Sequence, residues 1–389
     1  MPETYRILYV DDEPDVKPLV LQRMRREIRK RVYSFEFAGN GFEAVDVLSA
    51  DPTIDLVVSD INMPGMDGLT LLKQIPAINP NLRAIIVSAY GDMKNIRTAM
   101  NRGAFDFVTK PLDFRDFRIT VERTIDHLVK WREALAARDK LISLNNELSL
   151  ANQIQQSILP KVFPRTDSFS VFGRMQPARD IGGDFFDVVN LSDSLVGLAI
   201  ADVSDKGIPA ALFMMSSRTL LKGAALGHRN PGNALTEVNK IINADNPTGM
   251  FVTVLYAIYD QATNAVTFGN GGHNPPLLVH EDGTSSYLEM PDGIALGVFD
   301  GFDYDVKQCT LAPGDNLVLY TDGVTEAMNS EGELFGEERL QDIVCDAVLH
   351  GVRDLTVPIV DAVHEYSRGE PQTDDITCMS LSIAGSRRV

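Results

Sequence analysis

The chain has 389 residues, a formal net charge of −18 and 44% hydrophobic residues. This length allows two or three domains. No apolar run is long enough to span a bilayer, and so acidic a chain repels the phosphate backbone of nucleic acids. Its three cysteines show no metal-ligand spacing, and no signal-peptide pattern is visible. We therefore expect a cytoplasmic protein that binds neither membranes nor nucleic acid.

Short apolar runs alternate with helix-length patterns over residues 1–113, which we take as the first domain. The runs cover 6–10, 34–38, 54–59, 82–87 and 104–108, and the helical patterns cover 14–31, 41–50, 67–75 and 92–102. This alternation predicts a doubly wound α/β domain with a parallel, five-stranded sheet. Ligands of such sheets bind beyond the carboxyl ends of the strands.

Polar side chains follow four of these runs. They are Asp11, Asp12, Asp60, Ser88 and Lys110. Clustered carboxylates need a cation to stay ionised, and ligands that are all oxygen favour Mg²⁺. The central Asp60 could attack a phosphoryl group and become an aspartyl phosphate. Lys110 would then pair with the phosphate and Ser88 would hydrogen-bond it, and a changed rotamer of Phe107 would report the event.

The segments 10–13, 59–68, 88–89 and 109–111 read VDDE, SDINMPGMDG, SA and TKP. In this order they resemble the response-regulator receiver family. The resemblance implies that Asp60 is the phosphoacceptor and that a histidine kinase is the phosphate donor. It further implies that Asp12 binds Mg²⁺ directly with Asp11 as its partner, and that the carbonyl of Asn62 completes the ligands.

A helical linker is predicted over 114–159. Apolar residues recur every seven positions at Phe114, Val121, Leu128, Leu135 and Ile142, and the stripe shifts by one residue near Leu141. No Gly or Pro interrupts the pattern before Pro160, so one helix would span ~65–70 Å. Sustained heptads favour a coiled coil and a homodimer through 114–158. The shift is a candidate for transmitting a signal. The alternative is a helix packed back on its own domains.

Strand patterns dominate the last domain, residues 160–389. Strands are expected at 169–175, 184–189, 195–201, 251–259, 264–269, 276–280, 305–310, 316–320 and 376–383, and helices at 208–227, 231–244, 336–349 and 354–368. Runs of strands with paired helices predict an α+β fold, a β-sandwich flanked by helices.

Acidic residues punctuate this domain at the borders of apolar runs. They are Asp184, Asp202, Asp322, Asp374 and Asp375. Singly, each could be a turn-forming residue. Together, without a His or Cys partner, they predict a site for two Mg²⁺ or Mn²⁺ ions that activate a water for attack on phosphorus.

The strings GGDFFD (182–187), DVS (202–204), NGGHNPP (270–276), YTDGVTE (320–326) and DDIT (374–377) resemble the sporulation-type serine phosphatases of the protein phosphatase 2C-like superfamily. The resemblance implies that Asp184 and Asp202 are shared metal ligands together with the Val203 carbonyl. Asp322 and Asp374 would complete the catalytic site, with Asp375 as the alternative to Asp374. One departure is Asp205, where the family usually has glycine. For His273 we favour packing over catalysis.

These patterns lead to one principal hypothesis, a response regulator whose output is a protein serine/threonine phosphatase. The resemblance implies a phosphoserine anti-sigma-factor antagonist as substrate and thereby control of a sigma factor. A second hypothesis is a non-catalytic adaptor of an anti-sigma or sigma-factor system, switched by receiver phosphorylation. A third is a dimeric scaffold that responds only to phosphorylation.

Overall fold

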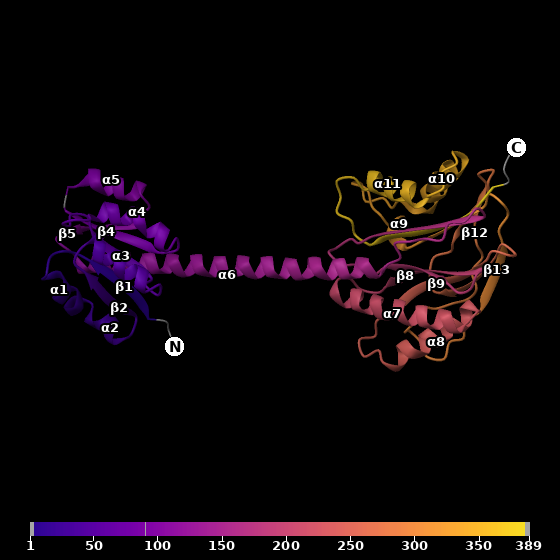
Figure 1. The fold of residues 1–389 in the computed structure, drawn as a ribbon, viewed down its shortest axis with the longest axis horizontal. Coiled ribbons are helices and arrows are strands. Elements are labelled where there is room, and N and C mark those ends of the chain that lie inside the picture. The colour runs from indigo at the N-terminus through magenta and orange to yellow at the C-terminus, as the bar shows by residue number, and fades with distance from the viewer. Residues whose placement is uncertain (1–3, 90, 386–389) are drawn as a thin grey trace. The chain divides into compact units, whose positions relative to one another are not determined.

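The computed structural model describes residues 4–89 and 91–385. The chain forms two compact units that divide between Ser143 and Leu144 (Figure 1). Among the helices of the described ranges, none is both long enough and apolar enough to cross a bilayer.

The N-terminal unit is built on one sheet with the strand order β2-β1-β3-β4-β5, and each pair of neighbours is parallel. Its strands are β1 (Tyr5–Val10), β2 (Tyr33–Ala38), β3 (Leu56–Asp60), β4 (Arg83–Ala89) and β5 (Asp106–Lys110). The connecting helices are α1 (Val16–Arg23), α2 (Arg25–Arg29), α3 (Gly41–Ala50), α4 (Gly68–Ile78) and α5 (Met93–Asn101). The predicted doubly wound fold is confirmed.

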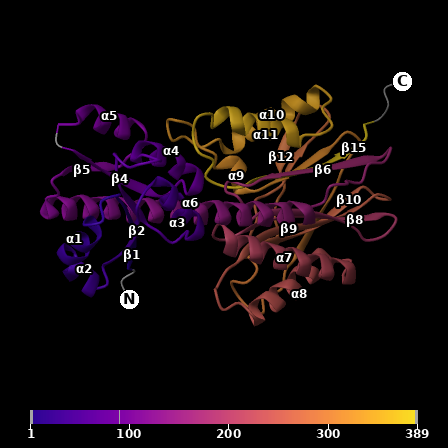
Figure 2. The same ribbon diagram turned by 60° about the vertical axis from the view of Figure 1, so that its left-hand side comes forward.

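Apolar strand residues supply a hydrophobic core on each face of this sheet. Figure 2 shows the helices that flank the sheet. One core contains residues of α3, α4 and α5, and the other contains residues of α1 and of the first turns of α6 (Phe114–Ile158). Strands that are covered on both faces read as continuous apolar runs, which is why the sequence pattern predicts them well. The predicted helix at 14–31 is instead two helices, because the backbone leaves helical geometry at Met24.

Helix α6 is continuous over 45 residues, as predicted, but its heptad residues do not share one environment. Val121 is fully buried in the core of the N-terminal unit, and Leu128 is only 1% exposed. They are therefore unavailable to a second chain, and the prediction of a coiled coil that begins at residue 114 is wrong for these turns. Leu141 and Ile142 are 60% and 51% exposed. The apolar surface that remains for a partner helix lies in this later part of α6.

The C-terminal unit contains two five-stranded antiparallel sheets, with the orders β13-β10-β9-β8-β7 and β12-β11-β14-β15-β6. The strands are β6 (Phe169–Gln176), β7 (Phe185–Asn190), β8 (Leu195–Val203), β9 (Val252–Asp260), β10 (Ala265–Gly271), β11 (Leu277–Val279), β12 (Ser285–Tyr287), β13 (Val306–Thr310), β14 (Asn316–Tyr320) and β15 (Ile376–Ile383). The predicted α+β sandwich is confirmed.

Two pairs of helices enclose the sandwich. Figure 1 shows α7 (Ile208–Gly227) and α8 (Pro231–Ala244) on one side, and α10 (Gly336–Leu349) and α11 (Thr356–Tyr366) on the other. One large core contains residues of both sheets and of α7 and α8, and a smaller one lies under α10 and α11. The short helix α9 (Asp322–Thr325) directly follows β14. The predicted acidic residues lie close to strand ends of both sheets. Asp184 directly precedes β7, Asp202 lies near the end of β8, and Asp322 follows β14.

Candidate active site

The first acidic cluster lies at the carboxyl edge of the parallel sheet. Ligand atoms of Asp11, Asp12 and Asp60 all lie within 4.8 Å of one another. The strand order explains this, because β1 and β3 are neighbours and end at the same edge. Burial raises the pKa of Asp11 above its ordinary value. An all-oxygen set of buried and exposed carboxylates fits a hard divalent cation such as Mg²⁺.

Lys110 projects into this cluster from the end of β5. Its Nζ lies 2.7 Å from Oδ2 of Asp60, 3.2 Å from Oδ2 of Asp11 and 2.8 Å from Oε1 of Glu13. Burial alone would lower the pKa of Lys110, but its hydrogen bonds to Asp60 and Glu13 outweigh burial and raise it. The ammonium group is therefore fixed beside the predicted phosphoacceptor.

The other predicted receiver residues lie on the adjoining strands and loop. Ser88 is buried in β4, and its Oγ has no hydrogen-bond partner among the described residues. Phe107 in β5 is 36% exposed, so its ring has room to change rotamer. The backbone amide of Asn62 lies 3.4 Å from Oδ1 of Asp60, which places the Asn62 peptide beside the cluster.

The second acidic cluster joins the two sheets of the C-terminal unit. Asp184 precedes β7, Asp202 lies in β8 and Asp322 begins α9. The carboxyl groups of Asp184 and Asp202 lie near enough to affect each other's pKa. Asp184 is only 1% exposed, and Oγ1 of Thr321 donates a hydrogen bond of 2.8 Å to its Oδ2.

Burial and mutual repulsion disfavour the charged forms of these carboxyl groups. The pKa of Asp184 lies well above its ordinary value because of burial and the neighbouring charges of Asp202 and Asp375. Burial likewise raises the pKa of Asp202 to about 7, with further contributions from the charges of Asp322 and Asp374. Such a cluster is stable in its ionised form only beside compensating positive charge. Its donors are all oxygen, so divalent Mg²⁺ or Mn²⁺ fits.

Asp374 and Asp375, which the sequence left as alternatives, have different surroundings. Oδ1 of Asp375 accepts a hydrogen bond of 2.7 Å from the amide of Ala178, and Oδ2 accepts bonds of 2.6 and 3.2 Å from the amides of Gly183 and Asp184. Both of its oxygens are thus used to hold the loop that presents Asp184. In Asp374, Oδ1 accepts a 2.9 Å hydrogen bond from the amide of Asp375, and Oδ2 lies 2.8 Å from Nζ of Lys206. Asp374 is also the more exposed of the two residues, since its side chain is 29% exposed whereas Asp375 is buried.

Glycine is required where the chain passes these carboxylates. A Cβ atom on Gly182 would lie 2.5 Å from Oδ2 of Asp375, and one on Gly323 would overlap the backbone carbonyl of Asp375. The glycines in the GGD and TDG strings therefore allow the acidic loops to approach one another.

Sequence reasoning missed Gln155, which connects α6 to the loop 177–184 between β6 and β7. We call this loop, which presents Asp184, the acidic loop. Its side chain is 1% exposed, its Nε2 donates a 2.6 Å hydrogen bond to the carbonyl of Gly182, and its Oε1 accepts a 3.0 Å bond from the Gly182 amide. Gly182 is two residues from Asp184. The helix end 153–160 reads QIQQSILP and resembles the opening segment of the sporulation-type phosphatases, and this resemblance is the sequence signal that could have found the contact.

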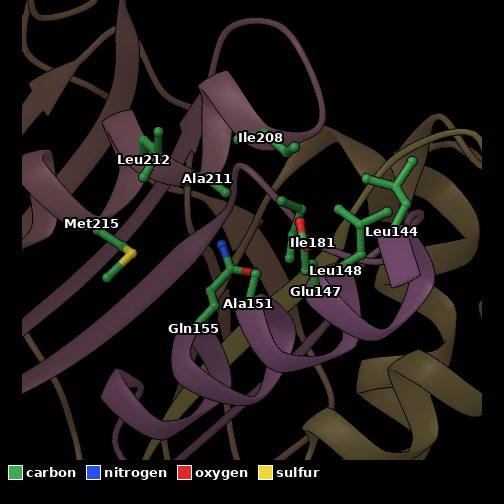
Figure 3. Close-up of a pocket in the computed structure, with 10 residues that line it drawn as sticks. All are labelled: Leu144, Glu147, Leu148, Ala151, Gln155, Ile181, Ile208, Ala211, Leu212 and Met215. Carbon is green, nitrogen blue, oxygen red and sulfur yellow. The ribbon is translucent and has the colours of Figure 1, made fainter. Parts of the chain in front are cut away.

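A mostly apolar cavity of about 160 Å³ adjoins Gln155 (Figure 3). Its lining side chains come from the end of α6, from Ile181 and from the first turns of α7. They are Leu144, Glu147, Leu148, Ala151, Gln155, Ile181, Ile208, Ala211, Leu212 and Met215. The end of α6, the acidic loop and the start of α7 therefore meet around one incompletely filled space.

Two cationic residues lie beside the second acidic cluster. Nη1 of Arg179 is 3.9 Å from the position that a Cβ atom on Gly207 would take, so Arg179 borders the loop that precedes α7. Lys206 belongs to the same loop. The departure from the family pattern, Asp205, has a φ of 69°, in the left-handed region that favours glycine.

The side chain of His273 is buried. Burial lowers its pKa to about 4, so the ring is neutral near pH 7. Its Nδ1 lies 2.9 Å from Oγ1 of Thr253, and its amide donates to Oδ1 of Asn270. Its Nε2 is buried without a hydrogen-bond partner among the described residues, and the packing role that we favoured from sequence stays a prediction.

Comparison with known proteins assigns both units. The family "Response regulator receiver domain" matches residues 7–122, and the family "Stage II sporulation protein E (SpoIIE)" matches residues 192–384. Protein IcfG of Synechocystis sp. is 28% identical over 263 residues, which cover 60% of this chain and 41% of that protein. Phosphoserine phosphatase RsbU of Bacillus subtilis is 26% identical over 250 residues, covering 64% of this chain and 74% of RsbU.

The fold of the C-terminal unit has a solved counterpart. The SiaA-PP2C domain of Pseudomonas aeruginosa superposes with a TM-score of 0.55 at 24% sequence identity, covering 62% of this chain and 98% of that domain. This chain therefore joins a response regulator receiver domain to a domain of the SpoIIE family that has a PP2C-like fold.

Proposed function

We propose that this protein is a response regulator whose output is a metal-dependent protein serine/threonine phosphatase. The observation that carries the proposal is the position of the buried Asp184 near the carboxyl group of Asp202 in a PP2C-like fold. Two carboxylates so placed need cations, and they lie where the two sheets present their strand ends. The similarity to a phosphoserine phosphatase over 250 residues supports the same reaction class.

The metals would be two Mg²⁺ or Mn²⁺ ions. Asp184 and Asp202 would be shared ligands together with the Val203 carbonyl, and Asp322 and Asp374 would complete the site. When bound, the ions supply positive charge to the phosphoryl group and activate a water for in-line attack on phosphorus. Thr321 and Asp375 have a positioning role, because their hydrogen bonds fix Asp184 and its loop.

Arg179 is suited to bind the substrate phosphate. It is exposed, and no ion pair engages its guanidinium group among the described residues. A guanidinium can donate two parallel hydrogen bonds to phosphate oxygens. In a chain of net charge −18, a local cation beside the acidic cluster also helps to attract a phosphorylated protein.

The substrate that we propose is a phosphoserine anti-sigma-factor antagonist. Its dephosphorylation would let it capture an anti-sigma factor and release a sigma factor. The support is the resemblance of the phosphatase domain to the sporulation-type family and its similarity to RsbU.

The input would be phosphotransfer from a histidine kinase to Asp60, with Mg²⁺ held by Asp11, Asp12, Asp60 and the Asn62 carbonyl. Lys110 is already fixed beside Asp60, and Ser88 and Phe107 lie on the adjoining strands. The first turns of α6 are packed in the core of this domain. A change in that packing could be passed along α6, whose other end holds the acidic loop through Gln155.

The decisive experiment measures hydrolysis of a phosphoserine protein by the purified chain in Mn²⁺, with and without beryllofluoride as a mimic of Asp60 phosphorylation. Asp202→Asn is the blank. We expect hydrolysis that is absent in the variant and that changes with beryllofluoride, with activation as the expected sign. Absence of hydrolysis in the parent chain under both conditions would overturn the proposal in favour of a non-catalytic adaptor.

A further inference from the structure

Lys206 makes a close contact with a carboxylate that the proposed reaction needs. Its Nζ lies 2.8 Å from Oδ2 of Asp374 and donates a 2.6 Å hydrogen bond to the carbonyl of Thr373. Lys206 lies between β8 and α7, whereas Asp374 precedes β15. The contact therefore joins loops from the two sheets across the mouth of the acidic cluster.

This contact differs from an ordinary surface ion pair because its electrostatic influence extends into the cluster. Burial raises the pKa of Asp322 and the charge of Asp374 raises it further, whereas the charge of Lys206 opposes this rise. Asp322 and Asp374 are the two proposed ligands that complete the metal site. The ammonium thus compensates part of the negative charge that would otherwise be available to a divalent ion.

We propose that Lys206 is a tethered cation that competes with a divalent metal for Asp374. It thereby weakens metal binding at the position that Asp374 completes. The inference rests on the proposed phosphatase function. If a divalent ion binds Oδ2 of Asp374, the ammonium must leave that oxygen, because two cations at one oxygen repel each other strongly at such separations. Its second acceptor, the Thr373 carbonyl, keeps the side chain nearby. Lys206 would therefore set the metal concentration at which the site fills.

Direct titration of Mn²⁺ binding by electron paramagnetic resonance of the free ion tests the proposal. All chains would be full length and carry Asp12→Asn, which weakens the receiver site. The parent is compared with Lys206→Met, with Lys206→Arg, which keeps the charge, and with Lys240→Met. Lys240 is an exposed residue of α8, so its replacement changes the net charge equally without touching the cluster.

We expect Lys206→Met to bind its weaker Mn²⁺ about tenfold more tightly than the parent, which corresponds to ~1.4 kcal/mol. Lys206→Arg should stay close to the parent, and Lys240→Met should change the affinity by less than about twofold, since exposed charges are screened. Thermal unfolding confirms that each variant is folded.

The two proposals can fail separately. The first requirement is that Asp374→Asn abolishes the weaker Mn²⁺ site of the parent chain. If it does, and Lys206→Met binds Mn²⁺ no more tightly than the parent, only the proposed role of Lys206 is overturned. If the parent chain and Asp202→Asn bind Mn²⁺ equally, the proposed phosphatase metal site is overturned, and this inference with it.

Discussion

The side chain of Gln155 and the peptide of Gly182 form a reciprocal pair of hydrogen bonds, 2.6 Å from Nε2 to the carbonyl and 3.0 Å from the amide to Oε1. The pair lies between the last turns of α6 and the loop that presents Asp184. A side-chain amide here satisfies both polar groups of a buried peptide, so the loop depends on the position of a helix that continues into the receiver domain.

Replacing Gln155 should therefore loosen the metal-binding loop. In Gln155→Ala, the amide and carbonyl of Gly182 lose their partners in a buried place, and we expect a loss of about 2 kcal/mol in unfolding free energy of the C-terminal unit. The Mn²⁺ concentration for half-maximal phosphatase activity should rise. Denaturant unfolding and an Mn²⁺ activity titration measure the two effects. Gln153→Ala, at an exposed position of the same helix, is the control. Equal behaviour of the two variants would contradict the role of Gln155.

The raised pKa values of the acidic cluster predict a pH dependence of stability. Asp202 has a pKa of about 7 in the folded chain without metal, compared with its ordinary 3.8. Between these values the folded state binds a proton that the unfolded state has lost, so stability falls as pH rises through this window. The midpoint of thermal unfolding in EDTA should fall from pH 5 to pH 8. Asp202→Asn should flatten this slope relative to the parent chain.

The same linkage gives metal binding a pH dependence. Mn²⁺ must displace protons shared by Asp184 and Asp202 at low pH, so it should raise the unfolding midpoint more at pH 8 than at pH 5. An equal rise at both pH values would show that these carboxyl groups are not the ligands.

Asp374 and Asp375 should differ in what their replacement damages. Asp375 accepts three backbone hydrogen bonds, so Asp375→Asn leaves a loop amide without a good acceptor and should destabilise the unit by about 2–4 kcal/mol. Asp374→Asn removes an accessible carboxylate and should leave stability nearly unchanged while it weakens Mn²⁺ binding. Chemical denaturation and metal titration of the two variants separate these effects, and a strongly destabilised Asp374→Asn would refute the assignment.

Some features were predictable from sequence because they follow from local patterns. Buried strands appear as apolar runs, and Asp60 and Asp202 lie at or beside strand ends that the topology brings to an edge. The short strand β12 was missed because Ser285–Tyr287 carries no alternating apolar pattern. Gln155 could not be recognised from pattern alone, since a polar residue in an amphipathic helix normally faces solvent. Val121 and Leu128 were misassigned because a helix packed on its own sheet and a coiled coil show similar apolar spacing.

The homodimer predicted from the heptads of α6 can be tested because Leu128 is buried whereas Leu141 and Ile142 are exposed. Leu141→Asp together with Ile142→Asp changes exposed apolar residues of α6, so it should lower the mass in light scattering from dimer to monomer without unfolding the receiver domain. Leu128→Asp buries a charge in the receiver core and should destabilise that domain by several kcal/mol. A monomeric parent chain, or a dimer that survives the double substitution, would exclude this segment as the interface.

Asp205 offers a change that should stabilise the enzyme. Its φ of 69° places a non-glycine residue in the left-handed region. Glycine adopts this conformation without steric cost. Asp205→Gly should therefore stabilise the C-terminal unit by up to about 1 kcal/mol, after the greater flexibility of glycine in the unfolded chain is taken into account. Because Asp205 is exposed and outside the proposed ligand set, Mn²⁺-dependent hydrolysis should persist in both forms. Asp193→Gly, at an exposed position between β7 and β8, provides a charge-matched control. A lower stability of Asp205→Gly than of the parent would show that the carboxylate stabilises the fold by more than the backbone strain costs. Loss of hydrolysis that the parent shows would place Asp205 in the catalytic site.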